Sequence, residues 1–203
     1  MINPLLLTDV YKLSHREQYP EGTTLVYSNW TPRKSRKKGI DKVVLFGLQA
    51  FIKKYLIDMF NEGFFNRPKQ EVLEEYQSQV ESYLGTPYNV DHIGELHDLG
   101  YLPICIKAIP EGDSVGIRTA MLTMYNTEPE FFWLTNYLET LISNVLWQPC
   151  TSATLAKQYR QILDEYAQKT NPEAADYVDW QGHDFSMRGL QGVESSVLSG
   201  MGH

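Results

Sequence analysis

The chain has 203 residues and a formal net charge of −7, and 42% of its residues are apolar, 12% aromatic and 21% charged. This composition excludes an intrinsically disordered chain, and no apolar stretch reaches the roughly 18 residues that a membrane-spanning helix needs. We therefore expect a soluble globular protein. The N-terminus has no basic region ahead of a long apolar run, so no export signal is indicated and the cytoplasm is the expected compartment.

The two cysteines, Cys105 and Cys150, form no CxxC pair and have no histidine at a metal-ligand spacing. This usage is typical of a reducing compartment and argues against a disulfide framework or a zinc site. Both cysteines lie among apolar residues, so we expect inert, buried thiols and no metal held by protein ligands.

The N-terminal segment predicts a short helix followed by a strand. The helix covers residues 7–15, with Thr8 or Asp9 as its cap, and residues 19–22 form a turn. Residues 24–31 alternate apolar and polar side chains, which favours a strand.

A basic run, residues 33–38, follows this strand. The first 60 residues hold ten basic and five acidic residues, whereas the remainder of the chain is strongly acidic. A basic loop at the end of a strand can hold an anion, although a solvated loop is the alternative. Nucleic acid is not the expected partner, because the whole chain is acidic and the run has no interleaved aromatic residues.

Three helices are predicted between the basic run and residue 100. One covers residues 47–59, a second begins at Pro68, and a third, shorter one ends at Gly100. The second presents one apolar face, formed by Val72, Leu73, Tyr76, Val80, Tyr83 and Leu84.

The second half of the chain predicts strands first and then helices. Residues 102–109 and 119–125 form a hairpin-like pair of strands. Thr127 and Glu130 form a capping-box pattern ahead of residues 131–147, which are apolar nearly all round and therefore predict a buried helix.

The C-terminal part predicts a helix over residues 151–169, a strand over 177–180 and a terminal helix over 189–203. Helices and strands alternate, which favours an α/β or α+β fold with a boundary near residue 100. The terminal helix has no cap, polar tail or closing strand after it, so we expect the sequence to be an incomplete portion of a larger protein.

The strongest local group of chemistry-bearing side chains is His183, Asp184, Phe185 and Arg188, at a junction between a predicted strand and a helix. Loops beyond strand ends bind ligands in α/β folds, and an arginine beside a helix N-terminus can hold phosphate oxygens. The alternative is that His183 and Asp184 pair with each other while Phe185 belongs to the core. No phosphate-binding loop, GxGxxG motif or nucleophile elbow occurs.

Seven segments, in order along the chain, resemble the nicotinamide phosphoribosyltransferase family: residues 8–20, 26–28 with Arg33, 46–49, 102–112, 126–130, 133–140 and 183–189. The resemblance runs from about Leu5 to the last residue. It implies a type II phosphoribosyltransferase, with an α+β N-terminal domain over residues 1–100 and the incomplete beginning of an α/β barrel over 101–203.

The resemblance also implies an activity. Members of the family transfer the phosphoribosyl group of phosphoribosyl pyrophosphate to nicotinamide, forming nicotinamide mononucleotide and pyrophosphate in NAD salvage. Mg²⁺ accompanies phosphoribosyl pyrophosphate, and ATP acts as a coupled activator. The expected partners are these substrates and a second copy of the chain in a homodimer with shared active sites.

Roles for individual residues follow from the resemblance alone. Phe185 would be one ring of an aromatic sandwich around nicotinamide, and Tyr11 of a second subunit would be the other. Arg188 would hold phosphate or pyrophosphate oxygens beside the ring, and His183 would line the channel to the pocket. Asp9 would lie near Tyr11.

Arg33, also from the second subunit, would contribute to the phosphate or pyrophosphate site, which gives the basic run a function. The family's later Gly-Thr-Asp segment, phosphorylated histidine, Arg-Asp pair and glycine-rich loops do not occur here. We therefore expect no catalytic residue in this portion and no activity from the 203 residues alone. The alternatives are a non-catalytic dimerisation or regulatory module and a related nicotinate phosphoribosyltransferase.

Overall fold

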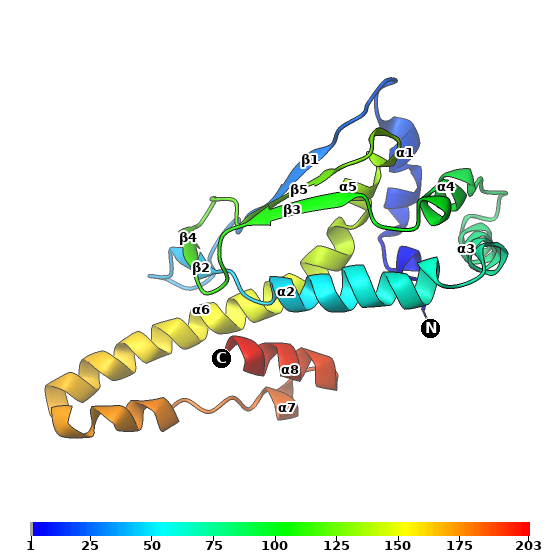
Figure 1. Ribbon diagram of the computed structural model, residues 1–203. Coiled ribbons are helices and arrows are strands. Elements are labelled where there is room, and N and C mark those ends of the chain that lie inside the picture. The colour runs from blue at the N-terminus through cyan, green and yellow to red at the C-terminus, as the bar shows by residue number, and fades with distance from the viewer. Residues whose placement is uncertain (1) are drawn as a thin grey trace. The chain divides into compact units, whose positions relative to one another are not determined.

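The structure, a computed structural model, describes residues 2–203 and consists of 58% helix and 10% strand. The predicted mixture of helices and strands is thus confirmed, and Figure 1 shows the elements along the chain. The chain packs as two units, each built from three segments. Unit 1 comprises Met1–Asn29, Gln49–Lys107 and Thr123–Ser143, and unit 2 comprises Trp30–Leu48, Ala108–Leu122 and Asn144–His203. The predicted domain boundary between residues 1–100 and 101–203 stays a prediction. The two units group segments that pack together, and they do not test where a domain begins or ends along the chain.

A three-stranded sheet, mostly in unit 1, has the order β1-β5-β3. Its strands are β1 (Tyr27–Trp30), β3 (Ile104–Ala108) and β5 (Leu122–Asn126). The Ile109 amide donates to the Met121 carbonyl (3.1 Å) and the Thr127 amide to the Pro103 carbonyl (2.8 Å), so β3 and β5 run antiparallel. The predicted pairing of these two segments is confirmed, and β3 lies at an edge of the sheet.

The connection between β3 and β5 is longer than a hairpin turn because it contains a strand of its own. This strand, β4 (Ser114–Gly116), pairs antiparallel with β2 (Lys42–Val44) in unit 2. Lys42 lies opposite Gly116 and Val44 opposite Ser114.

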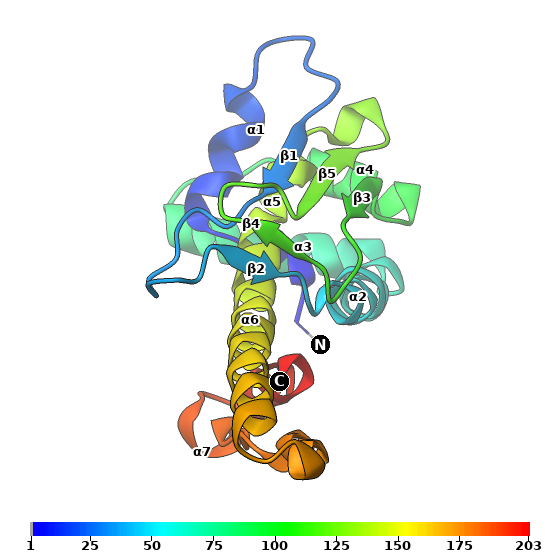
Figure 2. The same cartoon turned by 90° about the vertical axis from the view of Figure 1, so that its left-hand side faces the viewer.

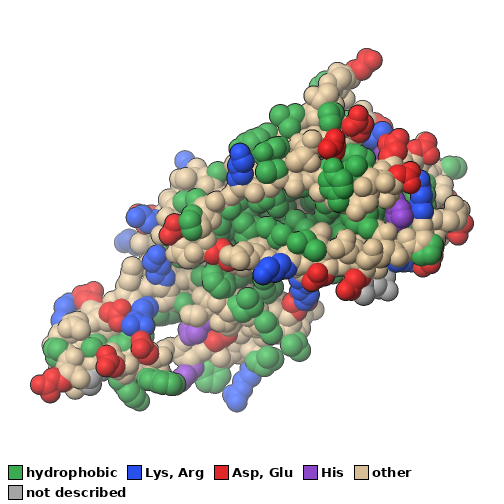
Figure 3. All heavy atoms as spheres, in the orientation of Figure 1, with side chains coloured by type: hydrophobic (Ala, Val, Ile, Leu, Met, Phe, Trp, Pro, Cys, Tyr) green, Lys and Arg blue, Asp and Glu red, His purple; other side chains and the backbone are tan. Residues whose placement is uncertain are grey.

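The helical segments of unit 1 begin with η1 (Pro4–Leu6), η2 (Val10–Ser14) and α1 (His15–Gln18), followed by α2 (Leu48–Phe51), which continues through the π-helical turns η3 (Ile52–Met59) and η4 (Asn61–Phe65). They continue with α3 (Lys69–Leu84), α4 (Asp91–Leu99), η5 (Pro129–Phe131), α5 (Leu134–Tyr137) and the start of α6 (Glu139–Thr170). Figure 3 shows hydrophobic side chains gathered in a hollow on the face that carries β3.

A buried chain of hydrogen bonds links the N-terminus of unit 1 to two of its helices. The Tyr137 hydroxyl donates to the Leu5 carbonyl (2.6 Å), so the Tyr76 hydroxyl, 2.9 Å from that of Tyr137, is the donor between them. Tyr76 and Leu5 are fully buried. Burial raises the pKa of both tyrosines well above its ordinary value, which keeps both hydroxyls protonated as donors.

Several local predictions need correction. The segment over residues 177–180 is not a strand, because Pro172–Trp180 forms a 3₁₀ helix, η6. On α3, Tyr83 is 67% and Leu84 40% exposed, since the buried face ends at Val80. The two helices predicted over residues 131–147 and 151–169 are largely one helix, α6, which accommodates Pro149 in its interior.

The predicted helix caps are confirmed only in part. Asp9 is the N-cap residue of η2, but its side chain makes no capping bond, and the N-cap residue of η5 is Glu128 and not the predicted Thr127. The Thr8 hydroxyl donates to the Tyr137 carbonyl instead (3.0 Å), so tertiary contacts take the place of local capping.

In unit 2, one stretch of α6 around Pro149 holds the segment that leads from β2 to α2. The Val44 amide donates to the Thr154 hydroxyl (2.9 Å), and the Phe46 amide lies 3.4 Å from the Cys150 sulfur. A Cβ at Gly47 would lie 2.8 Å from Pro149 Cγ, so only glycine allows this approach.

The C-terminal helix of unit 2 docks on the same stretch of α6. This helix, α8 (Val193–Gly202), follows the short α7 (Ser186–Gly189). The Gln148 side-chain amide donates to the Ser195 carbonyl (2.6 Å), and the hydroxyls of Ser152 and Ser199 are 3.1 Å apart. Figure 2 shows α8 alongside α6.

We predict that Thr154→Val destabilises the protein by about 1–3 kcal/mol, because it leaves the buried Val44 amide without an acceptor. The free energy of unfolding in urea measures the loss. Thr170→Val is the matched control, since that hydroxyl is exposed and bonds within its own helix, and its expected change is within about 0.5 kcal/mol. Equal losses in the two variants would contradict the assigned role of Thr154.

We also predict a stability loss on acidification from His92. Burial, reinforced by the charge of Arg16, lowers the pKa of His92 from 6.5 to about 4. Between these values the unfolded chain binds a proton that the folded chain does not, so stability falls as the pH drops from 6.5 towards 4, by up to about 3 kcal/mol. Unfolding free energies of the wild type and His92→Gln at pH 7 and pH 4.5 test this. Parallel losses in both proteins would show that His92 is not responsible.

Candidate functional site

In unit 1 the candidate residues Asp9 and Tyr11 lie on and beside the short helix η2. Two contacts hold Asp9 on the first turn of α6. The Thr140 hydroxyl donates to the Asp9 carboxylate (2.6 Å) and accepts from the Asp9 amide (3.3 Å). One threonine therefore fixes both the backbone and the carboxylate of Asp9.

The neighbouring residue Lys12 holds Tyr11 in place. The Lys12 side chain is buried, and its Nζ lies 2.6 Å from Glu139 Oε2 at the start of α6. The same ammonium group lies 5.2 Å from the centroid of the Tyr11 ring, and the His15 ring also lies 5.2 Å from it. Tyr11 nevertheless stays 58% exposed, so its ring is oriented but accessible.

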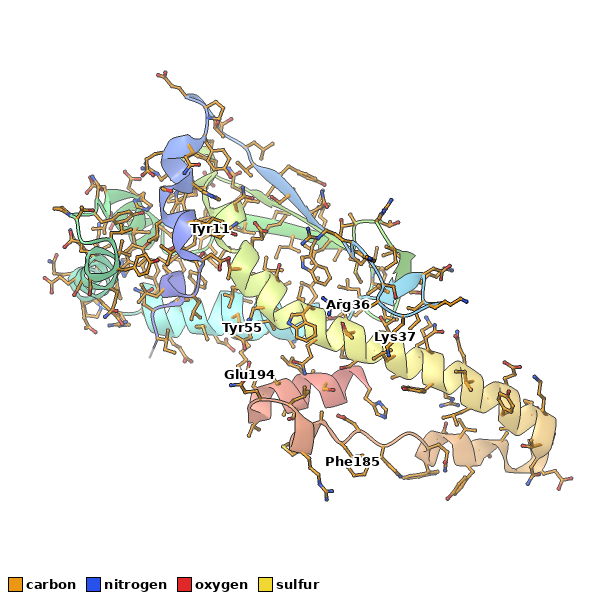
Figure 4. The ribbon with its side chains drawn as sticks, turned by 180° about the vertical axis from the view of Figure 1, so that it is seen from behind. Tyr11, Arg36, Lys37, Tyr55, Phe185 and Glu194 are labelled. Carbon is orange, nitrogen blue, oxygen red and sulfur yellow. The ribbon has the colours of Figure 1, made fainter. Side chains whose placement is uncertain are left out.

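In unit 2 the structure brings His183, Phe185 and Arg188 into contact. The His183 and Phe185 rings meet edge to face, with centroids 6.4 Å apart and planes at 84°. The Arg188 guanidinium lies 5.6 Å from the centroid of the Phe185 ring. Phe185 is 61% exposed, so the alternative that it belongs to the core is wrong. Figure 4 shows Phe185 on the loop that leads into α7.

Asp184 shapes the backbone of this segment. Its carboxylate accepts from the Ser186 amide (2.8 Å) and the Ser186 hydroxyl (2.7 Å), an arrangement that starts α7. These hydrogen bonds lower the pKa of Asp184, which stays ionised.

Two serines hold α7 against α8. The Ser196 hydroxyl donates to the Ser186 carbonyl (3.0 Å), and the Ser186 hydroxyl lies 3.3 Å from the Ser196 carbonyl. Since α8 is docked on α6 around Pro149, the position of Phe185 depends on that docking.

Arg33 lies in the exposed loop between β1 and β2, in the same unit as Phe185. The Arg118 amide donates to the Pro32 carbonyl (2.8 Å) at the start of this loop, and the Ser35 hydroxyl accepts from the Lys37 amide (3.1 Å) within it. Arg36 and Lys37, which are labelled in Figure 4, are exposed as well. The loop thus presents several guanidinium and ammonium groups to solvent.

A hollow of unit 2, with a volume of about 380 Å³, lies beside α6 and the C-terminus. It is lined by Arg160 and Asp179, which form a salt bridge (2.7 Å), and by Gly182 and His203. None of the six predicted site residues lines it. They lie instead on open surface, Asp9 and Tyr11 in unit 1 and the other four in unit 2.

Sequence reasoning missed the residues that position the candidates, namely Lys12, Glu139, Thr140, Ser186 and Ser196. The small side chains of α8 were the one available signal, since serine and glycine at regular spacing allow close helix packing.

The two cysteine thiols follow the prediction of inert, buried groups only in part. Burial raises the pKa of Cys150 to about 11, so it stays protonated, but Cys105 is only half-buried.

Among residues 2–203, no three histidine, cysteine, aspartate or glutamate side chains come together as a metal site. Within the same range, no helix has both the length and the apolar character to cross a bilayer.

Comparison with known proteins shows the family of the chain. Residues 3–106 match the family described as the N-terminal domain of nicotinamide phosphoribosyltransferase. The chain belongs to this family. The resemblance found in the sequence is thus confirmed, for the N-terminal portion of such a protein.

Three curated relatives carry the name nicotinamide phosphoribosyltransferase. The protein of Acinetobacter baylyi is 50% identical over the whole chain, which covers 41% of that relative. The protein of Xanthomonas campestris pv. campestris is 34% identical, with 99% of this chain and 41% of the relative covered. For Mycoplasma genitalium the identity is 30%, with 98% and 47% covered. The chain spans less than half the length of these relatives.

The crystal structure of human nicotinic acid phosphoribosyltransferase has the same fold in this region. It matches with a TM-score of 0.62 at 17% identity, and covers 97% of this chain and 34% of the human one. At this identity the match supports the fold and says nothing of the substrate.

We predict that Thr140→Val frees the segment that carries Asp9 and Tyr11. The change removes the hydroxyl that binds both the Asp9 amide and the Asp9 carboxylate, so this amide is expected to exchange its hydrogen about tenfold faster. Hydrogen exchange resolved to single amides measures the effect.

Thr140→Ser keeps the hydroxyl and should restore slow exchange. Thr151→Val, on the same helix, is the control, because the Thr151 hydroxyl donates to the Trp147 carbonyl of its own helix. Unchanged exchange in Thr140→Val would show that Asp9 is held by other contacts.

Proposed function

We propose that the protein is the N-terminal portion of a nicotinamide phosphoribosyltransferase, which forms nicotinamide mononucleotide and pyrophosphate from nicotinamide and phosphoribosyl pyrophosphate. The observation that carries this proposal is the family match over residues 3–106, with 50% identity to the Acinetobacter baylyi enzyme along the whole chain. As a corollary we propose a role in NAD salvage and a cytoplasmic location.

The geometry around Phe185 supports a site for a flat heteroaromatic ring. An exposed phenylalanine offers a ring face on which nicotinamide can stack, and its carboxamide then stays free for hydrogen bonds. The guanidinium of Arg188 is held against the same phenylalanine, so an anion bound by Arg188 would lie beside the stacked ring.

The proposed reaction explains why the chain needs no catalytic dyad here. The ring nitrogen of nicotinamide attacks the anomeric carbon, a carbon–nitrogen bond forms, and the carbon–oxygen bond to pyrophosphate breaks. That nitrogen carries no proton, so no general base is required. The developing charge is positive on the sugar and negative on the leaving group, and arginine side chains stabilise the latter.

We propose that Arg188 and Arg33 supply this positive charge. Both side chains are exposed, and Arg33 belongs to a loop with further basic groups.

Mg²⁺ would accompany the pyrophosphate, because phosphate oxygens and water are the usual ligands of this ion. No side chain of this chain is assigned to it. ATP as a coupled activator belongs to the part of the family sequence that this chain does not match.

We further propose that Tyr11 and Asp9 serve the site of a second subunit in a homodimer. The support is local: Tyr11 is exposed yet oriented by Lys12 and His15, as a stacking residue must be. No observation favours the alternatives of a regulatory module or a nicotinate enzyme, since the structural match to the latter is one of fold.

The proposal is tested by joining residues 1–203 to the part of the Acinetobacter baylyi relative that lies beyond its match with this chain. We expect this fusion to convert nicotinamide and phosphoribosyl pyrophosphate to nicotinamide mononucleotide, while residues 1–203 alone do not. Phe185→Ala in the fusion should raise the KM for nicotinamide about tenfold or more, because a stacking partner is lost.

Met187→Ala is the matched control, since Met187 is equally exposed (64%) two residues away and should leave the KM unchanged. Turnover by residues 1–203 alone would refute the view that this portion lacks the catalytic part. A folded but inactive fusion, or equal KM values in the two variants, would refute the proposed function or the role of Phe185.

A further inference from the structure

The edge of the sheet in unit 1 is bordered by an apolar groove. The groove has a volume of about 410 Å³ and lies between β3 and the helix that runs from Leu48 to Phe65. Its polar side-chain groups are the Asn61 amide and the Tyr101 hydroxyl, which donates to Glu128 (3.2 Å), and no charged residue is among its lining residues. The lining residues are Ile52, Leu56, Ile57, Asn61, Phe65, Tyr101, Leu102, Ile104 and Ile106. Figure 3 shows this hollow as a field of hydrophobic side chains.

The π-helical turns of the helix explain how its side of the groove is built. Hydrogen bonds from residue i to i+5 give between four and five residues per turn. Ile52, Leu56, Asn61 and Phe65 are spaced by four or five residues and therefore line up along one side. On the other side, Ile104 and Ile106 alternate along β3 and face the groove together.

The backbone of β3 leaves hydrogen-bonding groups on the same side of the sheet. Pro103 and Ile109 bond to β5, so the odd-numbered residues between them point their amides and carbonyls towards β5. The amide and carbonyl of Ile106 consequently point outwards from the edge. Among the described residues, β3 has β5 as its single neighbouring strand.

Only one residue of β3 is of a kind that protects a strand edge. Soluble proteins block free strand edges with charged side chains, prolines or bulges. The one charged residue of β3 is Lys107, and its Nζ lies 5.9 Å from the Tyr125 ring on the neighbouring β5. Ile57 and Tyr101 on the rim of the groove remain 48% exposed each.

We infer that this groove and the edge of β3 bind an extended strand from the C-terminal part of the family protein. Outward backbone groups select an extended segment, and the uncharged groove selects apolar side chains at alternate positions of that segment. The curated relatives are more than twice as long as this chain, so members of the family have a C-terminal part from which such a segment would come. The inference rests on family membership and does not depend on the proposed catalytic roles.

A second copy of residues 1–203 is a poorer occupant. If two β3 edges paired, the groove-facing side chains of each would be Ile104 and Ile106, which already line their own groove. Two grooves would then adjoin and stay unfilled, which forfeits the apolar contacts that make the pairing favourable.

The test uses residues 1–203 together with the separately expressed C-terminal part of the Acinetobacter baylyi relative. We expect the two to form a complex, seen by size-exclusion chromatography with light scattering. The Ile106 amide should exchange its hydrogen at least tenfold more slowly in the complex than in residues 1–203 alone. Isothermal titration then gives the affinity for each variant.

Ile57→Lys places a charge in the groove and should weaken the complex at least tenfold. Leu25→Lys, at an aliphatic residue outside the groove that is 58% exposed against 48% for Ile57, should change it less than twofold. Ile106→Pro removes the outward amide, which an edge strand tolerates, and should weaken the complex at least tenfold, whereas Ile106→Val should not.

Three outcomes would overturn the inference. One is the absence of a complex between proteins that melt cooperatively. Another is a complex in which the Ile106 amide exchanges at its free rate, or in which Ile57→Lys and Leu25→Lys behave alike. The third is protection of the Ile106 amide in residues 1–203 alone together with a dimeric mass, which would make the second copy the occupant.

Discussion

The organisation of unit 2 depends on how α6 is packed around Pro149. A proline inside a helix removes one amide donor and offers a compact, apolar ring, and here that ring meets the backbone of Gly47. Thr154, one turn further on, accepts the amide of Val44. The helix α8 packs against the same stretch of α6 through serine and glycine residues. Two segments that are distant in sequence, the one after the basic loop and the one after α7, are therefore positioned by about two turns of one helix.

The candidate ligand residues share a design in which an exposed side chain is fixed by buried or paired neighbours. Tyr11 is open to solvent, but Lys12 beside it is buried and paired with Glu139. Phe185 is open as well, and its backbone is set by Asp184 and by α8. This division separates binding from folding, since the residues that would touch a ligand contribute little to the core.

The sequence predicted those elements whose apolar residues repeat with a clear period. The apolar face of α3 up to Val80, the pairing of residues 102–109 with 119–125, and the buried start of α6 follow from such patterns. The 3₁₀ helix at Pro172–Trp180 was missed, because its short aromatic stretch looks like a strand and no long-range contact is visible in sequence. The capping bond expected of Thr8 does not form for the same reason, because its hydroxyl donates to a carbonyl 129 residues away. The group around Phe185 and the basic run with Arg33 stood out in the sequence itself, and the family resemblance supplied their roles and added Tyr11. Their supports, such as Thr140, required coordinates.

The close approach of α8 to α6 has a mechanical consequence. A Cβ at Gly202 would lie 2.7 Å from the Pro149 carbonyl oxygen and 3.2 Å from the Ala153 amide, both of them backbone atoms that cannot give way. A side chain at position 202 would therefore push α8 away from α6. The hydrogen bonds between Ser186 and Ser196 would transmit that displacement to α7 and Phe185. Gly202, which is distant from Phe185 in sequence, thus sets the position of the Phe185 ring.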